Sequence, residues 1–396
     1  MNRDQQLRSA ARLAAIEPFH VMEVQSRAHE LEAQGRNIIH MEIGQPDFSA
    51  PPQVIEAATR AMRERSLGYT AALGLPELRE AISAYYRARY RVEVPAERVV
   101  VTAGASGAFL LALGTLVDPN DEVLMPDPCY PCNRHFVRLF EGRARMIAVD
   151  EHQSYQLSAS EVRREWNGSV RGVMLASPSN PTGTTIPTEE LHGIIDCAAS
   201  RGGFALVDEI YHGLTYGKDS GPPPTALAFS DEIFVVNSFS KYFNMTGWRL
   251  GWMVVPRGYV RDIEKLAQNA FICASAPAQY AALAAFRPDT IALLEQRRAE
   301  FERRRDFMIP ALRELGFRIP VVPQGAFYIY AGCERFGQDS SVFALRVLEE
   351  AGVAITPGLD FGTNQPERHV RIAYTQSMEQ LEEGVRRIAN LLGRRG

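Results

Sequence analysis

The chain has little cysteine and almost no net charge. Its 396 residues include 5 cysteines, and 43 lysines and arginines stand against 47 aspartates and glutamates, which leaves a formal charge of −4. A dilute, odd-numbered set of cysteines excludes a disulfide scaffold and favours a reducing compartment, so we expect a cytoplasmic protein. The near-neutral charge excludes a general attraction to polyanions, and we expect neither a nucleic-acid partner nor a membrane partner.

The sequence also lacks a long apolar run and an internal repeat. The uncharged stretch of most interest, 99–117, is near the length of a membrane span, but glycine, serine and threonine divide it. A strand, a glycine turn and a buried helix fit it better. Asp4, Glu17 and Glu23 interrupt any apolar leader segment. The composition, 46% hydrophobic and 23% charged, is typical of a globular protein, and the length predicts two to three domains.

Metal-binding spacings are scarce too. Cys129 and Cys132 have the CxxC spacing of zinc and redox motifs. No second such pair follows, and prolines at 126, 128 and 131 crowd the segment. We therefore interpret the two thiols as incidental and expect no metal site.

From residue 98 to 255, short β-rich runs alternate with helical patterns. Several runs are almost wholly apolar, as strands buried on both faces must be. A helix is expected over 188–201, with Thr188 as its N-cap and two acidic residues in its first turn. The alternation indicates βαβ units and a largely parallel sheet, in which sites collect at the carboxyl ends of strands. The expected strands are 99–102, 122–125, 145–149, 172–175, 204–208, 233–238 and 250–255.

The pattern changes after residue 287. A long charged helix is expected to about residue 316, followed by short strands near 325–330 and 370–373 and a final helix from Met378. The first forty residues are polar and helical in character, with apolar positions at Leu13, Ile16 and Met22. We expect segments 1–45 and 291–396 to form a small α+β domain and segment 46–290 to form a larger one. The three arginines at 303–305 are expected to lie on a solvated helix face.

Lys241 is the first residue that points to chemistry. It ends the motif Ser-Phe-Ser-Lys at 238–241, directly after an apolar strand, and Arg249 follows eight residues later. A lysine taken alone is most often a solvated surface group. Near other cations and away from water, however, an amine has a lowered pKa and can form a Schiff base. The hydroxyls of Ser238 and Ser240 and the guanidinium of Arg249 are groups that anchor a phosphate.

A glycine-containing turn at 102–108 offers a second phosphate element. It joins a strand to an apolar helix, whose first N–H groups and positive dipole end attract anions. The turn lacks the GxGxxG and GK[ST] patterns of nucleotide-binding loops, which disfavours a dinucleotide-dependent dehydrogenase. A tight turn made only for packing is the simpler alternative.

Polar residues follow two further strands. Asp208 ends the strand at 204–208, and a buried acid there needs a cation such as a protonated pyridine nitrogen. Tyr211, three residues on, can reach the phenolic oxygen of such a ring. Asn180, in Ser-Asn-Pro-Thr-Gly at 179–183, presents an amide at another strand end. An N-cap at Asp208 and a plain turn at Asn180 are the alternatives. With the lysine and the phosphate elements, these residues specify an aromatic aldehyde phosphate.

In combination the motifs resemble the class I and II aminotransferases of the pyridoxal-phosphate fold-type I superfamily. The resemblance runs from Gly-Gln-Pro-Asp-Phe at 44–48 to Arg371, and Ser-Asn-Pro-Thr-Gly and Ser-Phe-Ser-Lys…Gly-Trp-Arg-Leu-Gly carry it. It implies a three-layer αβα fold with a mostly parallel seven-stranded sheet and a smaller α+β domain formed by both chain ends. It also implies pyridoxal 5′-phosphate as cofactor and transamination between an amino acid and a 2-oxo acid.

The resemblance implies a cofactor role for each motif residue. Lys241 forms a Schiff base with the aldehyde and then moves a proton between the substrate α-carbon and the cofactor. Asp208 pairs with the pyridine nitrogen. Asn180 and Tyr211 hold the phenolic oxygen, and Tyr130 stacks on the ring. The implied phosphate ligands are Ser238, Ser240, Arg249, the amides of Ala105 and Ser106, and Tyr69 from a partner chain, so we expect a homodimer.

The same resemblance implies that Arg371 clamps the substrate carboxylate, in a site shared with Gly44, Tyr130 and Asn180. Many dicarboxylate-specific relatives have a second basic residue for the distal carboxylate. Here no lysine or arginine occurs between Lys265 and Arg287, and the glycine turn offers a neutral serine. A distal carboxylate would be buried unpaired, at a cost of several kcal/mol. We therefore expect a neutral amino donor: alanine, a branched-chain or an aromatic amino acid.

Other functions share these residues. β-Elimination by a cysteine–sulfur lyase, decarboxylation and cyclopropane-forming synthesis use the same scaffold and lysine. A non-catalytic amino-acid-sensing domain is the alternative from another class, although no DNA-binding module is expected before residue 40. These alternatives stay open at the level of the sequence.

Overall fold

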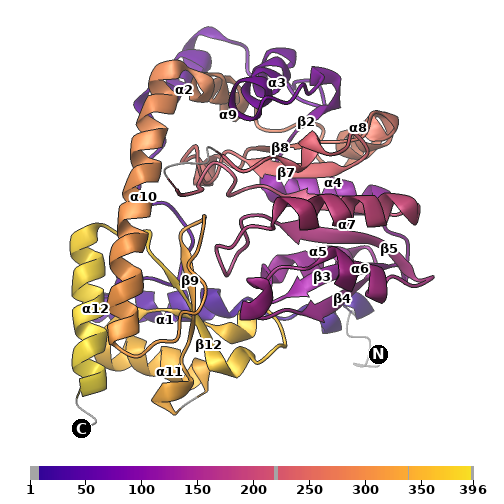
Figure 1. The fold of residues 1–396 in the computed structure, drawn as a ribbon. Helices are drawn as coiled ribbons and strands as arrows, with labels where there is room; N and C mark the ends of the chain where they lie inside the picture. The colour runs from indigo at the N-terminus through magenta and orange to yellow at the C-terminus, as the bar shows by residue number, and fades with distance from the viewer. Residues whose placement is uncertain (1–8, 218–221, 338, 394–396) are drawn as a thin grey trace, which may run out of the picture.

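The computed structural model describes residues 9–217, 222–337 and 339–393. A seven-stranded sheet forms the centre of its larger part (Figure 1). The strand order is β2-β8-β7-β6-β5-β3-β4, and β8 alone among them runs antiparallel to its neighbours. The strands are β2 (Val99–Thr102), β3 (Glu122–Asp127), β4 (Arg143–Ala148), β5 (Val170–Ala176), β6 (Phe204–Asp208), β7 (Phe234–Ser238) and β8 (Gly251–Val254). Every strand expected in this region is confirmed within two residues at each end.

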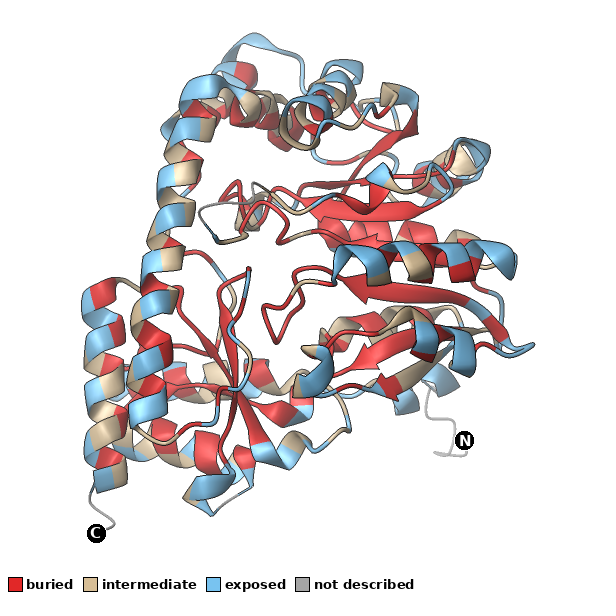
Figure 2. Ribbon diagram, viewed as in Figure 1, coloured by how far each residue is buried: buried red, intermediate tan, exposed pale blue. Residues whose placement is uncertain are grey.

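Helices cover both faces of this sheet because its central strands are apolar on both sides (Figure 2). Successive residues of a strand point to opposite faces, so Val99 and Val101 join one buried cluster and Val100 joins another. The cluster of Val100 includes side chains of α4 (Gly104–Leu116), α5 (Pro131–Leu139) and α8 (Val260–Ala270). The opposite cluster includes side chains of α6 (Ala159–Glu165) and α7 (Thr188–Ser200). These layers confirm the expected αβα architecture.

The start of α7 differs from its prediction. Its N-cap position is Pro187 and has no side-chain hydrogen bond, while Thr188 is the first helical residue. The predicted Thr188 cap is therefore wrong. Proline at 187 holds an extended backbone (φ −54°, ψ 139°), and this moves the start of the helix one residue earlier than a threonine cap requires.

A smaller α+β unit is built from both chain ends, as expected. Its three-stranded sheet has the order β11-β12-β9, and in a second small sheet β1 pairs in parallel with β10. The pairing of β1 with β10 joins the N-terminal segment to the C-terminal part. Domain boundaries at residues 45 and 290 stay a prediction. The strands are β1 (Ile39–His40), β9 (Tyr328–Gly332), β10 (Val353–Ala354), β11 (Thr356–Pro357) and β12 (His369–Ala373), with helices α1 (His20–Ala33), α11 (Ser340–Arg346) and α12 (Met378–Gly393).

The long helix α10 (Pro288–Glu314) runs from the end of the molecule that carries α2, α3 and α9 down to α12 (Figure 1). The bounds of those three helices are Pro52–Glu64, Pro76–Tyr90 and Ala276–Ala282. The expected solvated arginine face of α10 is wrong for its middle residue. Arg304 is 3% exposed, and its Nη1 and Nη2 each lie 2.9 Å from a carboxylate oxygen of Asp47. This paired contact fastens the Gly-Gln-Pro-Asp-Phe segment to α10.

Two further expectations concern thiols and membranes. Cys129 and Cys132 are unbonded, and burial raises the pKa of the Cys129 thiol to about 12, which makes it a poor nucleophile or ligand. None of the helices in the described ranges combines the length and the apolar character that crossing a membrane requires.

Candidate active site

A pocket lies where β5, β6 and β7 end and where α4 begins. Most of its lining residues come from those elements and the segments that follow them, and others come from the small unit and the segments before β2 and after β3. It brings together every residue predicted for the site except Tyr69. These are Gly44, Ala105, Ser106, Tyr130, Asn180, Asp208, Tyr211, Ser238, Ser240, Lys241, Arg249 and Arg371.

Lys241 follows β7, and its Nζ donates a hydrogen bond to the main-chain oxygen of Gly44 at 2.6 Å. Loss of hydration lowers the pKa of this amine to about 8, and the positive charges of Arg371 and Arg249 add to the effect. Asp208 opposes it. Part of the population is therefore the neutral amine near pH 7, which is the nucleophilic form.

Asp208 is the last residue of β6 and is 5% exposed. Its Oδ1 accepts a hydrogen bond from the Ile210 N–H at 3.0 Å. This contact resembles the N-cap considered as an alternative, but residues 210–213 form a turn and not a helix. Burial raises the pKa of the carboxyl group to about 7, although Lys241 and the Ile210 hydrogen bond oppose the rise. A buried acid with one hydrogen bond is suited to pairing with a cationic ring nitrogen.

Hydroxyl, guanidinium and main-chain N–H groups meet at the start of α4. The Ser238 Oγ lies 3.0 Å from the Ser240 Oγ, and Arg249 Nη1 lies 3.4 Å from the same Ser240 oxygen. Gly104 has φ +71°, and a Cβ built there would lie 2.7 Å from Arg249 Nη2. Only glycine leaves this space open, because a side chain would push the guanidinium aside. The arrangement is that of an anion cradle at a helix N-terminus.

Arg371 lies on β12, is 3% exposed and faces the opposite side of the pocket. Its Nη1 donates to the Asn180 Oδ1 at 2.9 Å, and its Nη2 donates to the Thr356 Oγ1 at 3.2 Å and to the main-chain oxygen of Glu42. Its buried Nε has no partner among the described residues. The guanidinium is thus held in place by neutral acceptors, and its charge remains available to an acid.

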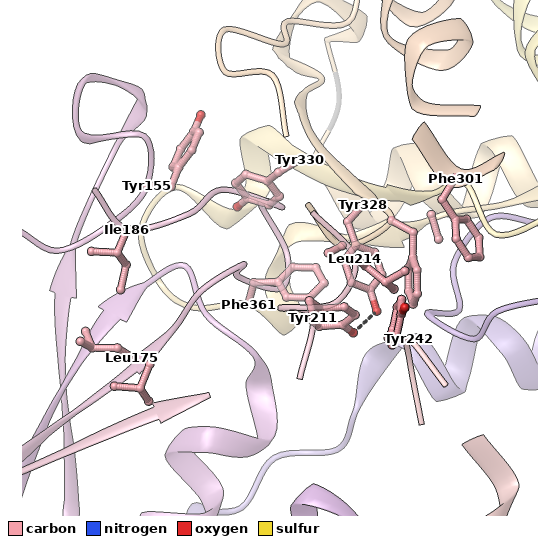
Figure 3. Packing of buried hydrophobic residues seen from close by; sticks show 14 of the residues in the cluster. Tyr155, Leu175, Ile186, Tyr211, Leu214, Tyr242, Phe301, Tyr328, Tyr330 and Phe361 are labelled. Carbon is pink, nitrogen blue, oxygen red and sulfur yellow. Dashed lines mark hydrogen bonds between the residues drawn. The ribbon is translucent and has the colours of Figure 1, made fainter. Parts of the chain in front are cut away.

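Tyr328 is a pocket residue that the sequence reasoning missed. Its hydroxyl lies 2.8 Å from the Tyr211 hydroxyl (Figure 3), and its ring lies 4.4 Å from the Arg371 guanidinium carbon. A Cβ on Gly44 would lie 1.7 Å from the Tyr328 hydroxyl, so glycine is required there. A tyrosine inside a predicted strand has no local signal for such a role, because the pocket contacts come from segments far away in the chain.

The rest of the pocket wall is apolar and was also missed. Phe19, Val21 and Met22 line it from the start of α1, and Phe109 and Phe136 line it from α4 and α5. Among the described lining residues, the cationic side chains are those of Lys241, Arg249 and Arg371. Leu13 and Met22, noted as apolar positions, are 53% and 50% exposed, and α1 instead buries Val21, Ala28 and Leu31.

Tyr69 lies outside the pocket. Its side chain is 83% exposed, in the connection between α2 and α3. Its predicted contact with a partner's phosphate stays a prediction.

Comparison with known proteins decides the family. The sequence model described as aminotransferase class I and II matches residues 36–388. The chain belongs to this family. This aminotransferase is 39% identical to valine–pyruvate aminotransferase of Mycobacterium tuberculosis, over 96% of its own length and 97% of that protein. It is 36% identical to an aspartate aminotransferase of Streptomyces avermitilis, over 97% and 96% of the two chains. A crystal structure of an aminotransferase from Mycobacterium tuberculosis matches 98% of this chain and 100% of that one, with 38% identity and a TM-score of 0.95.

Proposed function

We propose that this aminotransferase exchanges the amino group of a neutral L-amino acid with a 2-oxo acid such as pyruvate or 2-oxoglutarate, and that it uses pyridoxal 5′-phosphate. The donor would be alanine, a branched-chain or an aromatic amino acid. The observation that carries the proposal is the pocket wall: three cations, each placed for a different task, no fourth cation among the described lining residues, and an apolar side made by Phe19, Val21, Met22, Phe109 and Phe136.

The donor set of the pocket supports this cofactor. The cradle of Ser238, Ser240, Arg249 and the first amides of α4 suits a phosphate, and Gly104 keeps it open. Buried Asp208 suits a protonated pyridine nitrogen, with Asn180 and Tyr211 for the phenolic oxygen and Tyr130 against the ring. When bound, the cofactor supplies an aldehyde for the amino group and an electron sink for the carbanion at the substrate α-carbon.

The protein groups bind, orient and move protons. Arg371 binds the α-carboxylate of the substrate through its guanidinium, beside Gly44. In the proposed reaction the Lys241 Nζ would take up the proton of the substrate α-carbon and would pass it to the cofactor. Loss of hydration lowers the pKa of this amine to about 8, so part of it is neutral and able to accept that proton. The start of α1, with Phe19 and Val21, covers the site and excludes water.

The apolar wall favours a neutral donor over aspartate. A second carboxylate facing Phe109, Phe136 and Val21 would lose its hydration without gaining a partner within the chain. The similarity to a valine–pyruvate aminotransferase agrees with this, whereas the similarity to an aspartate aminotransferase points to the other donor, so the proposal rests on the pocket wall and not on the relatives. Selectivity among apolar donors is expected to be modest, roughly tenfold to a few hundredfold per methylene.

We further propose a homodimer in the cytoplasm, in which Tyr69 contacts the phosphate bound by the partner subunit. The large exposed side chain of Tyr69, outside its own pocket, supports this arrangement.

Single-turnover spectroscopy tests the proposed function. The reconstituted enzyme is mixed with one amino acid and no oxo acid, and the loss of the cofactor's aldehyde absorbance is followed. Alanine, valine, leucine and phenylalanine are expected to react at least tenfold faster than aspartate, and Lys241→Ala is expected to abolish the reaction. A faster reaction with aspartate would overturn the neutral specificity. Release of ammonia and pyruvate from a cysteine conjugate would show β-elimination instead.

A further inference from the structure

Two histidines and a glutamate meet on the surface of the small unit, away from the pocket. His29 and Glu32 lie on α1 at i and i+3, and His40 lies on β1. One ligand atom from each lies within 4.8 Å of the others. The His40 Nε2 is 3.1 Å from the Glu32 Oε1, and the two imidazole centroids are 5.8 Å apart. Only the return of the chain through β1 brings His40 beside the helical pair.

A buried carboxylate behind His40 is the second observation. Glu42 is 0% exposed, and its Oε1 lies 2.7 Å from the His40 Nδ1. Its Oε2 has no partner among the described residues. A fully buried carboxylate is costly unless a cation is close. Held by Glu42 through Nδ1, the His40 ring presents its Nε2 towards α1, which is the orientation that a carboxylate behind a metal-bound histidine produces.

We propose that His29, Glu32 and His40 bind a divalent transition-metal ion of the Zn²⁺ class, with Glu42 orienting His40 from behind. Two imidazole nitrogens and one carboxylate oxygen form a ligand set that Zn²⁺ uses, with a fourth position left for water. Nitrogen ligands favour Zn²⁺, Co²⁺ and Ni²⁺ over Mg²⁺ and Ca²⁺, which prefer oxygen.

Such an ion would join α1 to β1, and both elements lead to the active site. The start of α1 carries Val21 into the pocket. The main-chain oxygen of Glu42 accepts hydrogen bonds from Arg371 and from the Thr356 Oγ1, the latter at 2.8 Å. A metal ion here would hold in place the N-terminal segment that lines the pocket. The proposal of this metal site does not depend on which amino acid the enzyme uses.

Calorimetric titration of metal-free holoenzyme with ZnCl₂ tests the proposal. One ion per chain is expected to bind, with no comparable heat from MgCl₂. His29→Gln and Glu32→Gln, both at exposed positions, are each expected to weaken binding at least tenfold. Glu42→Gln is expected to weaken it by roughly 10–100-fold through loss of the orienting charge. A rise in the melting temperature on Zn²⁺ addition is expected for the unsubstituted chain and is expected to be lost in His29→Gln and Glu32→Gln.

A matched control is His192→Gln. His192 on α7 faces Asp196 across 3.5 Å, so it is an exposed histidine–carboxylate pair without a third ligand. Its substitution is expected to leave Zn²⁺ binding unchanged. Binding that survives His29→Gln, or that disappears in Cys132→Ser, places the ion elsewhere and overturns the proposal. Absence of Zn²⁺ binding at millimolar concentration also overturns it.

Discussion

Asp208 and Glu209 are neighbouring acids buried at the end of β6. Burial raises the pKa of each carboxyl group to about 7. Glu209 compensates with hydrogen bonds from Thr225 Oγ1 and the Ala226 N–H, whereas Asp208 has the Ile210 N–H. Asp208 therefore lies in the cofactor-free protein as an acid that is stable when protonated and costly when charged. Under the proposed function, this cost in stability is offset when the carboxylate pairs with the cofactor.

Replacing Asp208 with asparagine is predicted to stabilise the cofactor-free protein at pH 8. The folded-state pKa of about 7 lies above the ordinary value of 3.8. Between these values the folded state holds the proton more tightly than the unfolded state, so its stability falls as pH rises. The loss is on the order of a few kcal/mol. The Asp208→Asn side chain has no charge to bury, and its amide oxygen can still accept the hydrogen bond from the Ile210 N–H. The melting temperature of the variant at pH 8 is therefore expected to be roughly 2–6 °C higher than that of the parent.

Three comparisons make this prediction specific. The stability difference between variant and parent is expected to shrink as pH is lowered towards 4, since both side chains are then neutral. Saturating pyridoxal 5′-phosphate is expected to stabilise the parent more than the variant, and the variant is expected to lose most of its activity. A variant that is less stable than the parent at pH 8 contradicts the burial argument.

At the scale of elements, the start of α1 depends on a residue 340 positions away. The Asp360 carboxylate accepts hydrogen bonds from the N–H groups of His20 at 2.7 Å and Val21 at 2.8 Å. The residue before α1 is Phe19, which has no cap of its own. Asp360, 1% exposed, thus replaces the local cap and counters the helix dipole. Because Val21 lines the pocket, this contact also fixes the pocket wall.

Asp360→Ala is predicted to raise the KM for the neutral amino donor several-fold. Loss of the cap costs about 1 kcal/mol and frees the first turn of α1, so the apolar wall is less well formed. Steady-state kinetics and limited proteolysis near residue 20 measure the two effects. Asp339→Ala is the matched control, because Asp339 caps α11 through the Ser341 N–H at 2.8 Å, and Asp339 and Ser341 do not line the pocket. An equal rise in KM for both variants would show a general loss of stability.

Elements built from local patterns were predictable from the sequence, and contacts between distant segments were not. The central strands are short runs rich in valine, leucine, methionine and phenylalanine between turn residues, and this composition allows few other structures. Arg304 and Phe19 carried no such signal. An arginine among charged residues is predicted to be solvated unless a partner such as Asp47, 257 residues away, is known.

The catalytic motifs were predictable for a related reason. Lys241, Asp208 and Asn180 follow strands, and in a parallel sheet the ends of neighbouring strands meet at one edge. Tyr328 and the start of α1 come from the smaller unit. Their approach to this edge depends on how the two units pack, which no short motif records.

At the scale of the whole molecule, exposed apolar side chains gather near Tyr69 in the sequence. Ile55 and Met62, at i and i+7 on the same face of α2, are 46% and 57% exposed, and Leu67 is 37% exposed. Exposed apolar side chains that share a helix face are typical of an interface rather than of a free surface. A two-fold dimer through this face would carry Tyr69 towards the partner's pocket, as proposed.

Subunit mixing is predicted to restore activity between two inactive variants. If Tyr69 acts in the partner's site, a heterodimer of Lys241→Ala and Tyr69→Ala chains has one site with both defects and one site with neither. Refolding or exchanging the two variants together should therefore recover up to about a quarter of the parent activity per chain, because half of the dimers are mixed and each has one intact site. If Tyr69 acted within its own chain, each mixed site would contain one defect and no activity would return. Sedimentation of the mixture as a dimer is the accompanying control, since a monomer leaves Tyr69 without the partner that this prediction requires.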